Sequence, residues 1–252
     1  MAKVDKSQYS KEEWRKVKEQ RRLEKLKNKS QKEVKELAEQ PPVGMPSISK
    51  PVVPVKNNGV AFVLGNGTSR KSIDPEELQQ YGKIYGCNAL YRTFAPDYLV
   101  AVDVKMILEI NKSGYQHHNE VWTNPNRAYH KIRDLNLFHP SKGWSSGPTA
   151  LWLASQHRYE KIFILGFDYK GLDNGKKLNN MYADTMNYKK STEGATFFGN
   201  WLRQTTNVIK ENKNTMFYRV ITPENYVPEE LNKFSNVKHI FVEDFQKMFN
   251  LS

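Results

Sequence analysis

From Gly59 onward, short apolar runs rich in β-branched residues alternate with amphipathic stretches. This alternation is typical of a parallel β-sheet covered by helices, because parallel strands are buried on both faces and are joined by helical connections. We therefore expect an α/β domain with a doubly wound, mostly parallel sheet. Strands are expected at residues 60–64, 83–86, 98–102, 120–123, 161–166, 216–221 and 238–242. Helices are expected at residues 75–81, 148–157, 196–212 and 228–234.

The first part of the chain differs in composition from this domain. Residues 1–40 have the composition of a charged helix, in which Ser10 and Glu13 have the spacing of a capping box. Residues 1–56 hold 15 Lys and Arg against 8 Asp and Glu. Their net charge of +7 is more than half of the +12 of the whole chain. The basic arm is either a solvated helix or a surface that binds nucleic acid or an acidic protein. Residues 41–58 are rich in proline and predict an extended linker before the domain at 59–252.

Cysteine content and hydropathy narrow the class of protein. The single Cys87 cannot form an intramolecular disulfide, and no group of Cys and His has the spacing of a zinc site. No apolar run approaches the length of a membrane span, and the N-terminus is charged where a signal peptide is apolar. These features predict a cytoplasmic protein with no membrane span and no structural metal.

The first expected strand leads directly into the glycine-rich turn Gly65-Asn66-Gly67-Thr68-Ser69. Such a turn at the carboxyl end of a strand lets backbone N–H groups approach a phosphate or a ribose closely. The alternative is a plain tight turn. Arg70 stands where the dinucleotide-binding pattern has its third glycine, and the chain has no P-loop lysine motif.

Further polar residues follow other expected strands or begin a helix. Asn88, Asp103 and Asp168 each come at a strand end, and Ser145-Ser146-Gly147 begins the helix at 148–157. Because parallel strands align their carboxyl ends, these groups and Asn66 should meet at one edge of the sheet. The alternative for each of them is local: Ser146 is a good N-cap, and the two aspartates could cap the segments that follow them.

The order of these motifs resembles the bacterial sialyltransferases, whose pattern is G-N-G-P-S, R-C-N, Y-N-P, T-S-G and a strand ending in G-x-D-[FY]. The stretch P-D-Y-L-V-A-V-D at 96–103 is similar to the related pterin diphosphokinases and flagellin-glycosylating motility accessory factors. The resemblance covers about residues 59–169 and not the basic arm. It implies a Rossmann-like domain that binds a nucleotide sugar of the CMP-sugar class and transfers the sugar to an acceptor.

The resemblance also implies roles for single residues. The glycine turn would contact phosphate and ribose, Asn88 the nucleotide, and the turn at 145–147 the cytosine or a phosphate. Two departures, Gly86 in place of the family's Arg and Asp103 in place of an Asn, weaken the case for CMP in particular. The expected nucleotide-binding residues are Gly65, Asn66, Gly67, Thr68, Asn88, Asp103, Ser145, Ser146, Gly147, Asp168, Tyr182 and Tyr188.

A long aromatic and polar segment at 170–200 has the length of a lid that orders over a ligand. The sialyltransferases carry a catalytic His in this lid, and residues 170–200 contain no His. The expected base is therefore Asp184, with His139 as the other candidate, and Tyr182, Tyr188 and Lys189 are expected to stabilise the leaving phosphate. The alternative is that these lid residues are exposed loop groups.

These observations leave three functional classes. The first is a glycosyltransferase-like enzyme that uses a nucleotide sugar. The second is a non-catalytic nucleic-acid-binding or assembly protein on a transferase-derived fold, with the arm at 1–40 as its contact surface. The third is a diphosphokinase-like phosphoryl transfer that requires ATP and Mg²⁺, with Asp103 and Asp168 near the ion.

Overall fold

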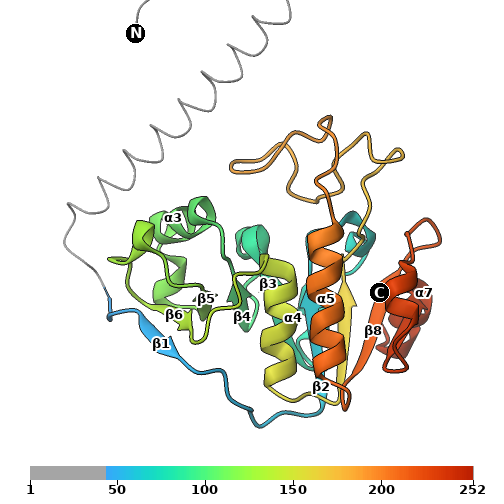
Figure 1. Ribbon diagram of the computed structural model, residues 1–252, viewed down its shortest axis with the longest axis horizontal. Coiled ribbons are helices and arrows are strands. Elements are labelled where there is room, and N and C mark those ends of the chain that lie inside the picture. The colour runs from blue at the N-terminus through green and yellow to red at the C-terminus, as the bar shows by residue number, and fades with distance from the viewer. Residues whose placement is uncertain (1–43, 252) are drawn as a thin grey trace, which may run out of the picture. The chain divides into compact units, whose positions relative to one another are not determined.

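A computed structural model describes residues 44–251, so the predicted basic arm at 1–40 lies outside the described residues. The described part contains a nine-stranded sheet in the order β1-β6-β5-β4-β3-β2-β7-β8-β9, in which every neighbouring pair is parallel (Figure 1). The strands are β1 Ile48–Lys50, β2 Val60–Leu64, β3 Lys83–Cys87, β4 Tyr98–Val100, β5 Val121–Thr123, β6 Leu135–Phe138, β7 Lys161–Leu165, β8 Met216–Ile221 and β9 Val237–Phe241. The expected doubly wound α/β fold is confirmed.

The direction in which the sheet grows reverses at β2. From β2 the chain adds β3, β4, β5 and β6 successively on one side, and it then returns to place β7 on the other side of β2. The connections after β2 and after β7 therefore leave the sheet in opposite directions. In open α/β sheets this switch point, at the carboxyl ends of the two strands, is where ligands bind.

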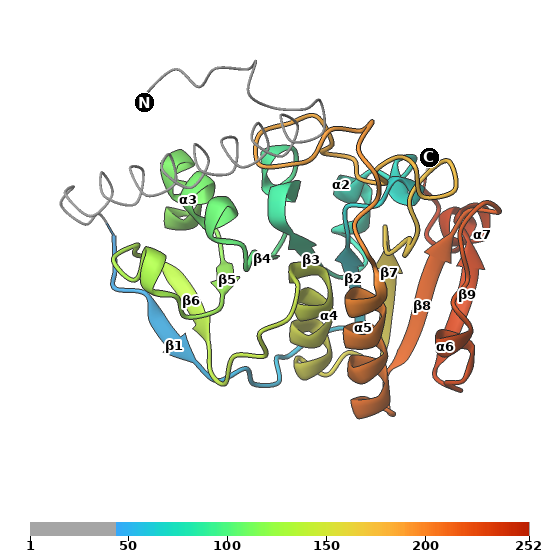
Figure 2. The same cartoon turned by 45° about the horizontal axis from the view of Figure 1, so that its top comes forward.

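Helices cover both faces of the sheet (Figure 2). Successive side chains of a strand point to opposite faces, so Ala61 and Val63 pack in one buried cluster, with α4 and α5. Phe62 and Leu64 pack in the other, with Phe245 of α7. The helices are α2 Pro75–Leu78, α3 Val104–Ser113, α4 Ser146–Gln156, α5 Gly199–Glu211, α6 Glu229–Asn232 and α7 Val242–Met248.

Local sequence explains the helix ends. Asp74 caps α2, its carboxylate accepting from the N–H of Glu76 at 2.9 Å, and Pro75 supplies a preset φ at the first position. At its other end, α3 stops at Gly114, which has a φ of +71° that favours glycine.

Four elements were not predicted from the sequence. Strand β1 lies inside the segment expected to be a linker and pairs with β6, so the sheet begins before Gly59. Strand β6 follows Asp134, which has a φ of +60° and no turn glycine beside it. Helix α3 begins after its N-cap Asp103, only three residues beyond β4, in a stretch expected to continue the strand to residue 102. Helix α7 begins directly after β9, so no turn residue separates these two elements.

The segment between β7 and α5 extends beyond the carboxyl ends of the strands, as the orange loop at the top of Figure 1 shows. Because α5 begins at Gly199, this lid comprises residues 170–198. It contains no helix and no strand longer than the isolated bridge between Leu172 and Lys177. Among residues 44–251, no helix has the length and apolar content needed to cross a membrane.

Candidate functional site

A cleft of about 390 Å³ lies at the carboxyl ends of the central strands. The turns that follow β2, β3, β4 and β7 line it, together with the start of α4, the lid and the start of α5. Its position matches the switch point between β2 and β7. A cleft of this size can hold a ligand as large as a nucleotide.

The turns after β2 and β7 pack against each other so closely that two positions require glycine. A Cβ on Gly65 would lie 2.5 Å from the carbonyl oxygen of Gly166, and one on Gly67 would collide with the Asp168 carboxylate. The Gly67 N–H donates to the Gly166 carbonyl at 2.9 Å. The Asp168 carboxylate accepts from the backbone N–H of Ser69 at 3.1 Å and from its hydroxyl. Asp168 thus joins the two turns.

Asn88 and Ser146 form a second polar connection across the cleft. The Ser146 hydroxyl donates to Asn88 Oδ1 at 2.7 Å and accepts from the Val102 N–H at 3.1 Å. Asn88 has a φ of +52°, a conformation that asparagine tolerates better than most residues. The Asn88 Nδ2 group has no partner in the described part of the chain, so it remains available as a donor to a ligand.

The start of α4 faces the same cleft. Its N-cap, Ser145, makes no side-chain capping hydrogen bond, and Ser145, Ser146 and Gly147 all line the cleft. The first N–H groups of a helix have no acceptor within the helix, and the helix dipole adds partial positive charge there. This end of α4 is suited to an anionic group such as a phosphate.

Four charged side chains line the cleft, and they differ in their hydrogen bonds and in their exposure to solvent. Asp168 is buried and held by Ser69. Asp103 makes no capping hydrogen bond to α3. Asp103 is exposed to solvent, and partial desolvation by the surrounding protein raises the pKa of its carboxyl above the ordinary value. Lys170 and Lys189 come from the lid, are exposed and supply positive charge at the opening.

Two buried arginines support the turns from inside the protein. Arg70 Nε donates to the Gly65 carbonyl at 2.5 Å, and Arg219 of β8 donates to the carbonyls of Phe167 at 2.9 Å and Asp168 at 3.5 Å. Neither guanidinium forms an ion pair with a carboxylate within residues 44–251, and each keeps one buried nitrogen without a partner. Both arginines therefore add positive potential beneath the turns that line the cleft.

The lid is docked on the glycine turn. The Tyr188 hydroxyl accepts from Asn66 Nδ2 at 3.1 Å and from the Ala89 N–H at 3.4 Å. Asn179 Oδ1 accepts from both the N–H and the hydroxyl of Thr68, each at 2.8 Å. Burial raises the pKa of Tyr188, so its phenol stays protonated. No acceptor among the described residues takes this proton, which is left for a ligand.

Most of the sequence-predicted site residues come together at the cleft. Those that line it are Gly65, Asn66, Gly67, Asn88, Asp103, Ser145, Ser146, Gly147, Asp168 and Tyr188. The structure therefore brings these ten residues together at one edge of the sheet.

The other predicted residues are placed differently. Thr68 and Tyr182 do not line the cleft, because Thr68 is bonded to Asn179 and the buried Tyr182 hydroxyl contacts Thr93 Oγ1 at 3.2 Å. Asp184 is exposed, and its carboxylate accepts from the Ser191 N–H at 3.1 Å, which makes it part of a lid turn. Hydrogen bonds from Ser191 lower the pKa of Asp184. His139 is exposed and lies outside the cleft. Neither expected base therefore lines the cleft.

Several cleft residues were not predicted as site residues. Phe198 and Trp201 belong to the start of α5, and their aromatic side chains after a long loop were the available indication. The others are Cys87, Pro148, Gly166, Phe167, Tyr169, Lys170, Gly171, Leu178, Asn179, Asn180, Asn187, Ala195 and Thr196. Lys189, expected from the sequence to stabilise the leaving phosphate, also lines the cleft. Tyr169 has a φ of +52°, rare for a bulky residue, and places a backbone kink directly after Asp168.

Within residues 44–251, no three His, Cys, Asp or Glu side chains are grouped as a metal site. Comparisons of the chain with protein-family models, with curated proteins and with solved structures find no match, so the interpretation of the cleft rests on its own geometry.

Proposed function

We propose that the cleft binds a nucleotide sugar and that the protein transfers the sugar to an acceptor hydroxyl. The observation that carries this proposal is the position of the cleft at the switch point between β2 and β7, where the glycine turn and the start of α4 face each other. The resemblance of the motifs at 65–69, 86–88 and 145–147 to the sialyltransferases supports a CMP-sugar as the donor class.

Each part of such a ligand has suitable partners in the cleft. The N–H groups at the start of α4, with Lys170 and Lys189, suit the phosphate. The Asn88 amide and the Tyr188 hydroxyl supply donors for the ribose or the base. The buried Arg70 and Arg219 favour an anionic ligand over a neutral one.

The proposed base is Asp103 rather than Asp184 or His139. It lines the cleft, it is not committed to capping α3, and its raised pKa makes it a better proton acceptor at neutral pH. In the proposed step the acceptor oxygen attacks the anomeric carbon and gives its proton to Asp103. The bond from that carbon to the phosphate oxygen breaks, and its electron pair leaves with the nucleotide. The positive groups around the start of α4 stabilise the leaving phosphate.

The test is isothermal titration of the full chain with CMP, CDP, UDP and GDP, each with and without an attached sugar. We expect CMP or a CMP-sugar to bind, and we expect Asn88→Ala to weaken binding at least about tenfold because it removes a polar contact in a desolvated site. The matched control is Asn207→Ala on α5, which does not line the cleft and should leave affinity unchanged. No binding of any of these ligands at millimolar concentration would overturn the proposal. A separate titration with ATP and Mg²⁺ tests the diphosphokinase alternative.

A further inference from the structure

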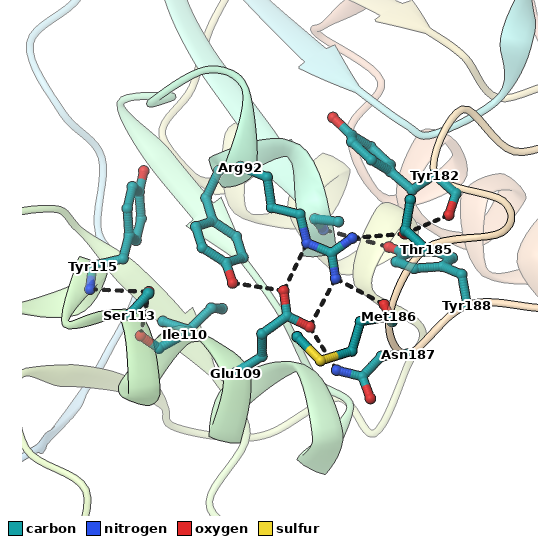
Figure 3. Close-up of polar contacts among 12 residues, drawn as sticks. Arg92, Glu109, Ile110, Ser113, Tyr115, Tyr182, Thr185, Met186, Asn187 and Tyr188 are labelled. Carbon is teal, nitrogen blue, oxygen red and sulfur yellow. Dashed lines mark hydrogen bonds and ion pairs between the residues drawn. The ribbon is translucent and has the colours of Figure 1, made fainter.

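An ion pair beside the cleft joins two elements of the domain body (Figure 3). Arg92 is the last residue of the 3₁₀ helix η3, Asn88–Arg92, and Glu109 lies in the middle of α3. Arg92 Nε contacts Glu109 Oε1 at 2.6 Å, and Nη2 contacts Oε2 at 2.7 Å. The Arg92 and Glu109 side chains are 20 % and 7 % exposed. The fork geometry and the partial burial make this a stronger contact than an ordinary surface ion pair.

The same two side chains also hold the lid. Arg92 Nη1 donates to Thr185 Oγ1 at 2.7 Å, and its Nη2 donates to the Met186 carbonyl at 2.8 Å. From the lid, Asn187 Nδ2 donates to Glu109 Oε2 at 2.5 Å. Three consecutive lid residues therefore contact one ion pair of the body, as Figure 3 shows.

The next lid residue, Tyr188, lines the cleft. The Arg92 guanidinium lies 5.7 Å from the centre of the Tyr188 ring, within the range of a cation–π contact. The Tyr188 hydroxyl in turn meets Asn66 and the Ala89 N–H, which belong to the turns after β2 and β3. The position of Tyr188 over the cleft thus depends on Arg92 from one side and on the glycine turn from the other.

We propose that Arg92 is a positioning residue which, together with Glu109, holds residues 185–188 of the lid over the cleft and so sets the affinity for the nucleotide. This inference rests on the proposed function for its ligand. A lysine at position 92 would keep the positive charge, but its single ammonium group cannot bond both Glu109 oxygens and both lid acceptors in the planar arrangement of the guanidinium. Charge alone is therefore not sufficient for the role.

The experiment compares the wild-type chain with Arg92→Lys in two measurements. The first is hydrogen–deuterium exchange without ligand, followed at the lid amides of Thr185 and Tyr188, which donate to the carbonyls of Tyr182 and Thr185. We expect exchange to be about tenfold faster in Arg92→Lys, which corresponds to the loss of roughly one charge-assisted hydrogen bond. The second is titration with CMP, in which we expect a dissociation constant about tenfold higher.

The matched control is Arg158→Lys. Arg158 is exposed and follows α4 at the amino end of β7, opposite to the cleft, so this change should alter neither measurement. Glu109→Gln is the second variant, because it keeps the shape of the side chain, removes the charge from the same contact and should have the same effects. Thermal unfolding of each variant separates loss of the fold from loosening of the lid.

Each outcome decides the inference. Faster lid exchange together with weaker CMP binding in Arg92→Lys and Glu109→Gln supports it. Unchanged lid exchange overturns it, whatever happens to binding. Faster exchange with unchanged CMP affinity overturns the positioning role, although it leaves the proposed function intact. If the wild-type chain does not bind CMP, the proposed function fails for this ligand, and the proposed effect of Arg92 on affinity fails with it. The exchange data still decide whether Arg92 holds the lid.

Discussion

The close approach of the turns after β2 and β7 makes Gly67→Ala the most informative single change. The alanine Cβ would lie 2.4 Å from an Asp168 carboxylate oxygen and 2.7 Å from the Gly166 carbonyl oxygen, whereas ordinary contact begins at 3.4 Å, so the two turns must separate by about 0.7–1 Å. The hydrogen bond from the Gly67 N–H to Gly166, now 2.9 Å, would then be too long to persist. Overpacking costs about 1–3 kcal/mol and the lost bond about 1 kcal/mol, or roughly 2–4 kcal/mol together.

For a domain of this size, that loss lowers the melting temperature by roughly 5–15 °C. The assay is thermal unfolding followed by circular dichroism, with CMP titration of the folded variant at low temperature, where we expect binding to weaken at least about tenfold. The matched control is Gly194→Ala in the lid, where a Cβ would have only the Gly175 carbonyl oxygen near it, at 3.9 Å. If Gly67→Ala proved as stable as Gly194→Ala, the described packing of the two turns would be wrong.

Three further predictions concern single side chains. Asp103→Asn should lower the turnover in a sugar-transfer assay by about 10²–10⁴-fold, while its affinity for CMP stays within a few-fold of wild type. The activity of the wild-type protein should fall as the pH drops through the raised pKa of this carboxyl. Equal turnover in the variant and the wild type would exclude Asp103 as the base. Tyr188→Phe leaves the Asn66 amide and the Ala89 N–H without their acceptor, so urea unfolding should show a loss of about 1–2 kcal/mol, and unchanged stability would contradict the lid contact. Burial lowers the pKa of His157 from 6.5 to about 4, so between these pH values the unfolded chain binds a proton that the folded chain does not. The free energy of unfolding should therefore fall as the pH decreases through this window, and His157→Gln should reduce that pH dependence.

The sequence was sufficient for the central part of the fold because the central strands are continuous apolar runs. β2 and β7 are buried on both faces and flanked by glycine or polar residues, so both strands were predicted close to their observed bounds. β1 was missed for the opposite reason: it is three residues long, mostly exposed and enclosed by prolines, and it is a strand only because β6 provides a partner. Such pairing depends on tertiary structure, so the local sequence pattern of residues 48–50 cannot predict it.

The edge of the cleft was predictable for a similar reason. Polar residues that directly follow parallel strands are brought together by the sheet itself, which is how Asn66, Asn88 and Asp103 meet. The sequence predicted that residues 170–200 form a lid, but it did not predict which residues the lid contacts. Arg92 and Glu109 are 17 positions apart, and the lid residue Thr185 lies a further 76 positions along the chain. No sequence periodicity connects them, so this arrangement became visible only in three dimensions.

The most direct test of the central claim is a crystal structure of the protein grown with CMP or a CMP-sugar. The account predicts a phosphate oxygen within about 2.7–3.2 Å of the backbone nitrogen of Ser146 or Gly147, at the start of α4. It also predicts the nucleoside against Asn88 and the turn at 65–67, with Tyr188 of the lid above it. A nucleotide bound elsewhere on the domain, or a phosphate at the cleft with no contact to the start of α4, would contradict the assignment of this cleft.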